Sequence, residues 1–408
     1  MARPQATPES PGSRALVVDL IRSAGPISRT ELTTATGLTQ PAISLIVRKL
    51  LDDEVIVEAG TVPSTGGKPR RLLDINRRAR HGIGIQLGFE SATLVATDTN
   101  GGVVARERLP GAGSDAPDDV IARLADSLES FLTAADIPAA SVQGVAVVLP
   151  GPMRTDPGTV IEAPTLPHWR DVPLRSAFET ALRMPVLVDN DASAAALGEF
   201  WSRGISRYRS FACVYIGSGI GAGVVVDGAL FRGASSNAAE IGHITVDPTG
   251  PECFCGNVGC LEVVAAPRAI VARALDDAAI TATLGLDERA TVAQNWEVLS
   301  RAAVDGDSAA TALVIESARA VAGATLTLTN LFDLDDIVLS GPGVATAGSL
   351  FVREVRASLG RAFARKAHSF SVELSINPTD SAAIGAAALT LQGQLAPGHG
   401  PALRFAGP

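Results

Sequence analysis

Near the start of the chain, hydrophobic residues recur at helical spacing in three short segments. The first begins at Arg14, and a Gly-Pro pair ends it at Gly25. Ser28 and Glu31 have the spacing of a capping box, which predicts the start of a second helix. Thr39 has the position of an N-cap for a third helix, whose apolar stripe leaves polar side chains facing outward. This order of helices is typical of the helix-turn-helix, which presents its last helix to the major groove of DNA.

Two β-like segments follow, at residues 55–57 and 72–75, with a turn from Gly60 to Gly67 between them and a wing tip at residues 66–71 that combines two glycines with three basic residues. Such a pair is typical of a winged helix domain, whose basic wing contacts phosphates or the minor groove. The residues expected to contact DNA are Thr39, Gln40, Pro41, Ser44, Arg48, Gly67, Lys68 and Arg70. The alternative is a protein-docking domain. The salt dependence of binding distinguishes the two functions. Phosphate contacts release counterions, so DNA binding weakens steeply as salt rises, whereas apolar docking does not show this dependence.

From Ile83 onward the hydrophobic residues alternate as in β-strands. One hairpin is expected over residues 83–104 and a second over residues 211–231, where four glycines alternate with other residues. Helices are expected at residues 120–134, 172–182 and 309–328. Two related hairpins, each followed by helices, predict a duplicated α/β body with a ligand cleft between two lobes.

Composition supports a folded protein of several domains. The chain has 408 residues, of which 46% are hydrophobic, and its formal net charge is -9. Residues 1–82 contain 12 Lys and Arg against 8 Asp and Glu, so a basic head precedes an acidic body. Four cysteines exclude a disulfide scaffold, and the polar N-terminus lacks the apolar core of a secretory signal. A cytoplasmic protein is expected, and no membrane span is expected at the uncharged residues 381–403, whose second half contains Pro, Gly and Gln.

Three of the four cysteines lie within eight residues, and a histidine precedes them by ten. Together Cys253, Cys255, Cys260 and His243 form a Cys3His set. Three thiolates and one imidazole complete a tetrahedral Zn2+ site and leave no open position for a reactive water, so structural zinc is expected. Buried free thiols are the alternative.

Carboxylates and an amide surround this cysteine loop. Glu240 precedes it and Glu262 ends it, while Asn190 and Asp191 follow an apolar strand-like segment. Each sugar hydroxyl both donates and accepts hydrogen bonds, so these groups at one rim of a cleft suit a sugar. A zinc-bound His243 can still bond a ligand through its second ring nitrogen.

At these residues the sequence resembles the ROK family, which contains sugar kinases and repressors. The resemblance rests on residues 150–152, 188–192, 240–243 and 253–262, and it extends over about residues 82–391, with a head like that of the repressor branch. It implies an α/β protein with an N-terminal winged helix-turn-helix and a two-lobed actin-like, hexokinase-like body. It further implies sugar contacts by Asn190, Asp191, Glu240, His243 and Glu262, and zinc ligation by His243, Cys253, Cys255 and Cys260.

The departures from the family pattern concern the kinase machinery. ROK kinases have an Asp-x-Gly-Gly-Thr-type first strand, and Gln86, Phe89 and Glu90 stand in the matching stretch here. An amide lacks the charge that hydrated magnesium prefers, a phenyl ring fills space needed by phosphate, and a carboxylate repels it. Pro342 alters a second nucleotide segment. Asp191, the general base of a kinase, is therefore expected only to anchor a hydroxyl.

The sequence thus predicts a sugar-responsive repressor of carbohydrate metabolism genes, without catalytic residues. Five segments are expected: a disordered N-terminus (1–13), the winged helix-turn-helix (14–80), a first lobe (81–191), a second lobe with the zinc loop and a C-terminal helix returning to the first lobe (192–394), and a flexible tail (395–408). The expected partners are a palindromic double-stranded DNA operator, a sugar or sugar phosphate, and further copies of the chain in a dimer or tetramer. The alternatives are an ATP-dependent sugar kinase with a DNA-binding head, and a regulator whose body binds a protein.

Overall fold

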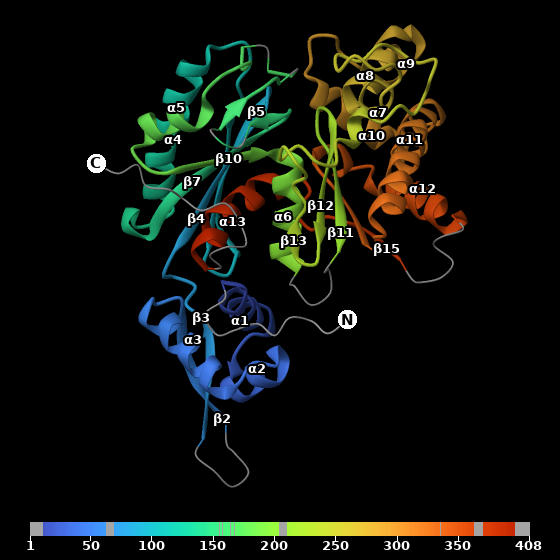
Figure 1. Cartoon of the computed structure of the whole chain (residues 1–408). Helices are drawn as coiled ribbons and strands as arrows, with labels where there is room; N and C mark the ends of the chain where they lie inside the picture. The colour runs from blue at the N-terminus through green and yellow to red at the C-terminus, as the bar shows by residue number, and fades with distance from the viewer. Residues whose placement is uncertain are drawn as a thin grey trace.

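A small N-terminal head lies below two lobes that stand side by side, and the helices α6 (Asp191–Arg203) and α13 (Ser381–Leu395) lie between the lobes (Figure 1). The computed structural model describes residues 11–62, 69–154, 156, 158–163, 165–166, 168–203, 210–334, 336–362 and 370–395. The mixed α/β architecture and the helical head agree with the fold class expected from the sequence.

The head is a winged helix-turn-helix. Its elements are α1 (Pro11–Ala24), β1 (Ile27–Ser28), α2 (Arg29–Thr36), α3 (Gln40–Asp52), β2 (Ile56–Val62) and β3 (Arg70–Ile75), and the strand order is β1-β3-β2. The capping box is present, because the Ser28 hydroxyl accepts from the Glu31 amide and the Glu31 carboxylate accepts from the Ser28 amide at 2.8 Å. Gly37 ends α2 with φ 70°, and the Thr39 hydroxyl caps α3. The three helices predicted from spacing and caps are therefore confirmed, but the first begins at Pro11 and not at Arg14, so residues 11–13 of the segment expected to be disordered are helical. The rest of that segment lies outside the described residues.

The wing differs from its prediction at one point. The strand β2 continues through Gly60 to Val62, with a change of register between Glu58 and Gly60, so the turn does not begin at Gly60 as expected. A bulge lets the strand absorb this glycine, which has φ 131°. Gly67 and Lys68, two of the residues expected to contact DNA, lie outside the described residues.

The first lobe is built on a five-stranded sheet of order β10-β7-β4-β5-β6. Its strands are β4 (His81–Leu87), β5 (Ser91–Asp98), β6 (Val103–Pro110), β7 (Val142–Leu149) and β10 (Val186–Asn190); the other elements are α4 (Pro117–Ala134), η1 (Ala139–Ser141), α5 (Leu174–Leu182) and the small pair β8 (Met153–Arg154) and β9 (Thr159–Val160). The first three strands form an antiparallel meander, and β7 and β10 add in parallel.

The second lobe repeats this plan, with a five-stranded sheet of order β13-β12-β11-β14-β15. Its strands are β11 (Phe211–Ile216), β12 (Ile220–Val226), β13 (Ala229–Leu230), β14 (Asp336–Ser340) and β15 (Ser371–Leu374), and its helices are η2 (Ile241–His243), α7 (Leu261–Ala265), α8 (Pro267–Asp276), α9 (Ala278–Leu284), α10 (Val292–Val304), α11 (Ser308–Phe332), η3 (Pro342–Val344) and α12 (Gly348–Arg361). An antiparallel meander again meets two parallel strands. The two sheets therefore share one topology, as the repeated hairpins in the sequence predicted.

Helix α11 is long and mostly apolar. Among the described residues it is the one helix whose length and apolar composition would suffice to cross a membrane. Here it packs against α10 and α12, and Val314, Val321 and Leu328 lie buried in the core of the second lobe. Its apolar character is accounted for by this packing.

Glycines allow α6 and α13 to cross in direct backbone contact. A Cβ atom on Gly385 would lie 1.7 Å from the carbonyl oxygen of Ala194, and one on Gly198 would lie 2.3 Å from that of Ser381. Helix α13 also lies against β4, where a Cβ on Gly84 would lie 2.1 Å from the Ala383 carbonyl oxygen. The Ala-rich C-terminal helix thus joins the first sheet to the helix that leads into the second lobe.

Replacing Gly385 by alanine should destabilise the protein, because the added methyl group meets main-chain atoms that cannot rotate away. We expect Gly385→Ala to lower the free energy of unfolding by at least about 1–3 kcal/mol in urea titrations. Gly323→Ala is the matched control: it lies on the exposed side of α11 with nothing within 4 Å of the added atom, and we expect a gain of about 0.5–1 kcal/mol. Equal effects of the two changes would contradict the close crossing.

Candidate functional site

Polar groups from both lobes meet in a cleft beside the N-terminus of α6. The cleft is lined by Pro150, Gly151, Pro152, Thr165, Asn190, Asp191, Tyr215, Gly217, Ser218, Gly219, Ile220, Gly221, Glu240, His243, Phe254 and Glu262. All five residues expected to contact a sugar are in this set. The glycine-rich bend between β11 and β12 forms one wall.

Asn190 and Asp191 are positioned by the junction of β10 and α6. The Asn190 side-chain oxygen accepts from the amides of Ala192 and Ser193 at 2.9 and 3.1 Å, so it caps the helix. Its amide nitrogen donates to the carbonyl oxygen of Gly151 at 3.3 Å. A carboxylate oxygen of Asp191 accepts from the Ala192 amide at 2.8 Å. The end of β10 and the start of α6 therefore hold the side chains of Asn190 and Asp191 in the cleft.

A salt bridge missed by the sequence interpretation supports this junction. Asp189, which is buried, accepts two hydrogen bonds from Arg232, at 2.6 and 3.1 Å. The paired geometry is the favourable one for a guanidinium and a carboxylate. Because Arg232 belongs to the segment after β13, the bond ties the end of the first sheet to the second lobe.

Three carboxyl groups lie close together in the cleft. Burial raises the pKa of Asp191 to about 7, with a smaller effect from the charge of Glu262. Loss of solvent and the charges of Asp191 and Glu262 raise the pKa of Glu240 to about 7, although the Glu240 side chain is exposed at the rim. Glu262 is held by Arg268, which donates at 2.7 Å. Near neutral pH the cleft thus contains carboxyl groups that donate as well as groups that accept.

Tyr215 lines the cleft and contacts Gln86, a pair that sequence reasoning did not connect. The Gln86 amide donates to the Tyr215 hydroxyl at 2.6 Å, which joins β4 of the first lobe to β11 of the second. Burial, together with the nearby Asp191, raises the pKa of the Tyr215 hydroxyl. A tyrosine in an otherwise apolar strand was the available signal. Its partner could not be identified, because the two residues are far apart in the chain.

Glu90 makes a second contact between the lobes. Its carboxylate accepts from the amide of Ala293 at 3.4 Å, at the start of α10. Phe89, beside it, is exposed. Gln86 and Glu90, which the resemblance places where a kinase needs magnesium and phosphate, are thus engaged with residues of the opposite lobe.

The cysteine loop brings its four candidate ligands together. One ligand atom from each of His243, Cys253, Cys255 and Cys260 lies within 4.8 Å of the others. The Sγ atoms of Cys255 and Cys260 are 3.6 Å apart, as are Cys253 Sγ and His243 Nδ1. Sulfur atoms about 3.8 Å apart are expected in a tetrahedron with metal–sulfur bonds of about 2.3 Å. The spacing therefore fits one tetrahedrally bound metal ion.

The fold of the loop prepares this geometry. Isolated β-bridges pair Thr245 with Cys260 and Glu252 with Val258. Gly259 has φ 62°, and a Cβ there would lie 1.5 Å from the Asp247 carbonyl oxygen, so no other residue fits. His243 also lines the cleft, and because Nδ1 faces the sulfur atoms, Nε2 is left for a molecule in the cleft.

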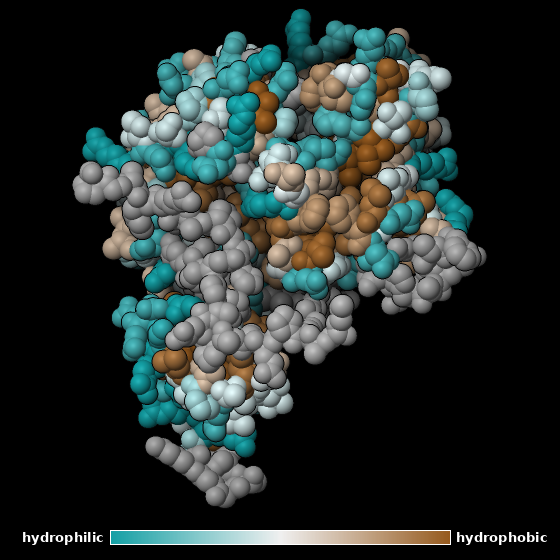
Figure 2. Space-filling view, viewed as in Figure 1, coloured by the Kyte–Doolittle hydropathy of each residue, from teal (hydrophilic) through white to brown (hydrophobic). Residues whose placement is uncertain are grey.

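In the head, the residues expected to contact DNA lie together on the outer side of α3. Thr39, Gln40, Pro41, Ser44 and Arg48 are all exposed there, and Arg70 is exposed on β3. Leu45 and Lys49 share this surface and were not predicted. Hydrophilic residues cover the side of the head where α3 lies (Figure 2).

The raised pKa of Asp191 predicts a pH-dependent effect of Asp191→Asn. The folded chain binds this proton more tightly than the unfolded chain, so the contribution of Asp191 to stability is complete below pH about 4 and is lost as the pH rises through about 7. Asparagine does not titrate. We expect the unfolding free energy of Asp191→Asn, relative to the native chain, to increase from pH 4 to pH 8 by at most about 1.4 kcal/mol per unit of pKa shift. Urea titrations at both pH values test this, and a constant difference would contradict it.

The chain is similar to known regulators and kinases. The model of the ROK family matches residues 82–393. A xylose repressor of Caldicellulosiruptor bescii is 28% identical over 389 residues, which are 94% of this chain and 96% of the repressor. A crystal structure of a ROK family transcriptional regulator, a homologue of an Escherichia coli protein, aligns with a TM-score of 0.71 and 27% identity over 95% of this chain and 97% of that one.

A kinase structure shares the body. The ROK family glucokinase of Streptomyces griseus, solved with glucose and AMPPNP, aligns with a TM-score of 0.66 and 29% identity over 77% of this chain and 100% of the kinase. The repressor and the regulator thus match nearly the whole chain, whereas the kinase matches about three quarters of it. The family match alone covers most of the chain, and the sequence motifs of the cleft and the cysteine loop lie within it. The protein therefore belongs to the ROK family.

Proposed function

We propose that this protein is a DNA-binding repressor of carbohydrate genes that responds to a sugar in the cleft. The observation that carries the proposal is one chain that joins a winged helix-turn-helix to a cleft lined by Asn190, Asp191, Glu240, His243 and Glu262. Matches to a xylose repressor and to a ROK regulator over nearly the full length support it.

The chemistry of the cleft favours a neutral, hydroxyl-rich ligand. Asp191 and Glu240 titrate near neutral pH, and Asn190 has amide hydrogens to donate. Donors and acceptors at one rim can satisfy hydroxyls that do both. Among the residues that line the cleft, His243 is the one basic side chain, which favours a free sugar over a sugar phosphate.

The contacts between the lobes argue against phosphoryl transfer. Gln86 is hydrogen-bonded to Tyr215, and the Glu90 carboxylate lies against the start of α10. Neither group neutralises phosphate charge, and catalysis by kinases depends on that neutralisation and on positioning. A sugar kinase with a DNA-binding head remains the rival function, favoured by the match to the glucokinase.

The Cys3His cluster would hold Zn2+ in a structural role. Three thiolates and an imidazole are ligands that zinc favours, and four protein ligands leave no position for a catalytic water. The ion would fix the loop that ends at Glu262 and the ring of His243, both at the cleft. Zinc would thereby hold one rim of the sugar site rigid.

On DNA, two copies of the chain would place their α3 helices on the half-sites of a palindromic operator. The exposed Gln40, Ser44 and Arg48 would read base edges, and Arg70 with Lys68 would contact phosphates. These steps suit a protein that acts in the cytoplasm.

The function is tested with the full chain, a panel of sugars and a DNA duplex selected from a random library. We expect D-xylose, D-glucose or another sugar of the panel to raise the melting temperature and to change the affinity for the duplex, measured by fluorescence anisotropy. Asp191→Asn should abolish the response, while Asp305→Asn, in an exposed loop, should keep it. DNA binding should weaken steeply as salt rises, because phosphate contacts release counterions. Phosphorylation of a sugar by ATP and magnesium, lost in Asp191→Asn, would instead establish the kinase.

Zinc is tested by metal analysis of the purified chain. We expect one zinc ion per chain in the native protein and in Cys213→Ala, since Cys213 is buried in β11 away from the cluster. Cys260→Ser should contain no zinc and should bind the sugar more weakly by about 10–100-fold, because His243 and Glu262 lose their fixed positions. Unchanged zinc content in Cys260→Ser would contradict the assignment of the ligands.

A further inference from the structure

The head contacts the body through a buried arginine. Arg22, in the last turn of α1, is 9% exposed, and its Nη1 donates to the carbonyl oxygen of Trp201 at 2.8 Å. Its guanidinium carbon lies 4.7 Å from the centre of the Trp201 ring. Trp201 is itself 7% exposed and belongs to the last turn of α6. One side chain of the head thus engages both the backbone and the ring of one residue of the body.

This contact satisfies Arg22 only while the head stays in place. Within the described residues Arg22 forms an ion pair with Asp19, 3.9 Å from Nε, and neither Nε nor Nη2 donates a hydrogen bond. The Trp201 carbonyl is one of the last four of α6, which have no partner inside the helix. A cation at this end of the helix also interacts favourably with the negative end of the helix dipole. Arg22 therefore caps α6 from another domain.

The opposite end of the same helix lies in the cleft. Asn190 caps α6, and Asp191 is its first residue. Thirteen residues separate cleft and head by only about 20 Å of continuous helix. The contact of Gly198 with the backbone of α13 prevents bending near the middle. A displacement at Asp191 is thus carried along the axis to Trp201.

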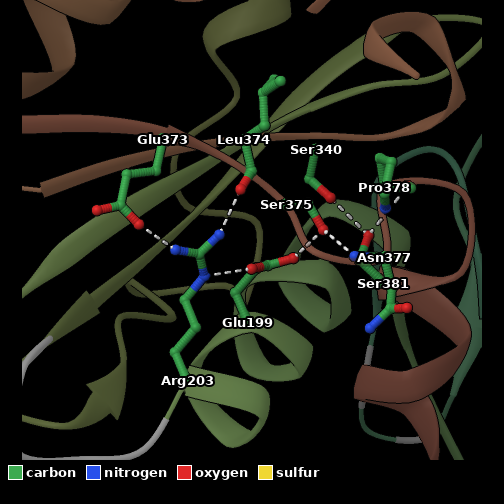
Figure 3. A network of polar contacts seen from close by, with 9 residues as sticks. All are labelled: Glu199, Arg203, Ser340, Glu373, Leu374, Ser375, Asn377, Pro378 and Ser381. Carbon is green, nitrogen blue, oxygen red and sulfur yellow. Dashed lines mark hydrogen bonds and ion pairs between the residues drawn. The ribbon is translucent and has the colours of Figure 1, made fainter. Parts of the chain in front are cut away.

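Hydrogen bonds anchor the last turn of α6 to the second lobe (Figure 3). Arg203 donates to Glu199 at 2.8 Å, to Glu373 at 2.5 Å and to the Leu374 carbonyl oxygen at 2.5 Å. The carboxylate of Glu199, which is buried, also accepts from the hydroxyl of Ser375. A movement of β15 and the following loop relative to the first lobe must therefore move this turn and with it the contact of Arg22.

We propose that α6 transmits the state of the cleft to the DNA-binding head, and that the bond from Arg22 to Trp201 is the point of transmission. The inference rests on the proposed function. Sugar binding changes the position of α6 at Asp191, the last turn follows, and the directional bond from Arg22 is retained in one position and lost in the other. A shift of 1–2 Å is on the order of helix movements in known switches and suffices to break a hydrogen bond.

Arg22→Met tests the transmission, because methionine keeps an unbranched apolar stem and removes the charge and the donors. The matched control is Arg14→Met on the same helix, since Arg14 pairs with Asp53 inside the head at 2.7 Å. The affinity of the full chain for the selected duplex is measured with and without a saturating sugar, D-xylose first and then the other sugars of the panel. We expect the native chain and Arg14→Met to show an affinity ratio of about 5–150, and Arg22→Met a ratio within about twofold of 1.

The reverse measurement applies the reciprocity of coupled sites. In the native chain the duplex should change the calorimetric sugar affinity by the same factor as the sugar changes DNA affinity, and in Arg22→Met the duplex should not change it. If Arg22→Met does not fold, Arg22→Lys takes its place. Lysine keeps the charge but lacks the planar guanidinium, which can stack on a ring and donate a hydrogen bond at the same time. We therefore expect its ratio of DNA affinities to lie between 1 and that of the native chain.

If Arg22→Met folds and binds sugar and DNA, and its ratio of DNA affinities with and without sugar equals that of the native chain, the inference is overturned and the proposed function stays intact. A native ratio in Arg22→Lys would do the same where only the lysine variant folds. A ratio of 1 in the native chain with every sugar of the panel would overturn the proposed function itself, and the inference with it.

Discussion

The close crossing of α6 and α13 is the constraint on which the rest of the structure depends. Backbone meets backbone at Gly198 and Gly385, and the alanines around them leave no side chain that could adjust. The two sheets belong to different lobes, yet they are held through the same pair of helices. A rigid crossing lets the lobes move as whole bodies about it, because packed helices slide or hinge more easily than they deform. The cleft lies beside the start of one of these helices, so the packing that stabilises the fold also places the site.

Much of this arrangement was predictable from local signals. Ser28 with Glu31, Gly37 and Thr39 predict the helix boundaries of the head, since caps act within one turn of the chain. The repeated hairpins predicted two sheets of one topology, and four ligand-type residues close in sequence predicted a set of metal ligands, whose side chains the fold brings together. These features depend on residues close in sequence, or on residue types that have few other uses.

Contacts between distant residues were not predictable. Gln86 was expected to be unsuited to magnesium, and nothing in the sequence paired it with Tyr215. The same holds for Asp189 with Arg232 and for Arg22 with Trp201. The start of the wing turn was misplaced, because a glycine within a strand at a bulge resembles a glycine in a turn. In each case the missing information was the tertiary position of a second segment.

The replaced kinase positions give a physical reason for the proposal that this protein binds a sugar without phosphorylating it. In a kinase of this fold, the lobes close around two substrates, and nucleotide charge must be neutralised between them. Here Gln86 and Glu90 already join the lobes through hydrogen bonds made by the chain itself. These contacts hold the lobes together on one side of the cleft. The carboxyl groups on the other side remain able to form hydrogen bonds with a ligand. Under the proposed function, closure depends on one small molecule, whose binding energy is available to shift the lobes and not to drive a reaction. An equilibrium of this kind is what a reversible regulator requires.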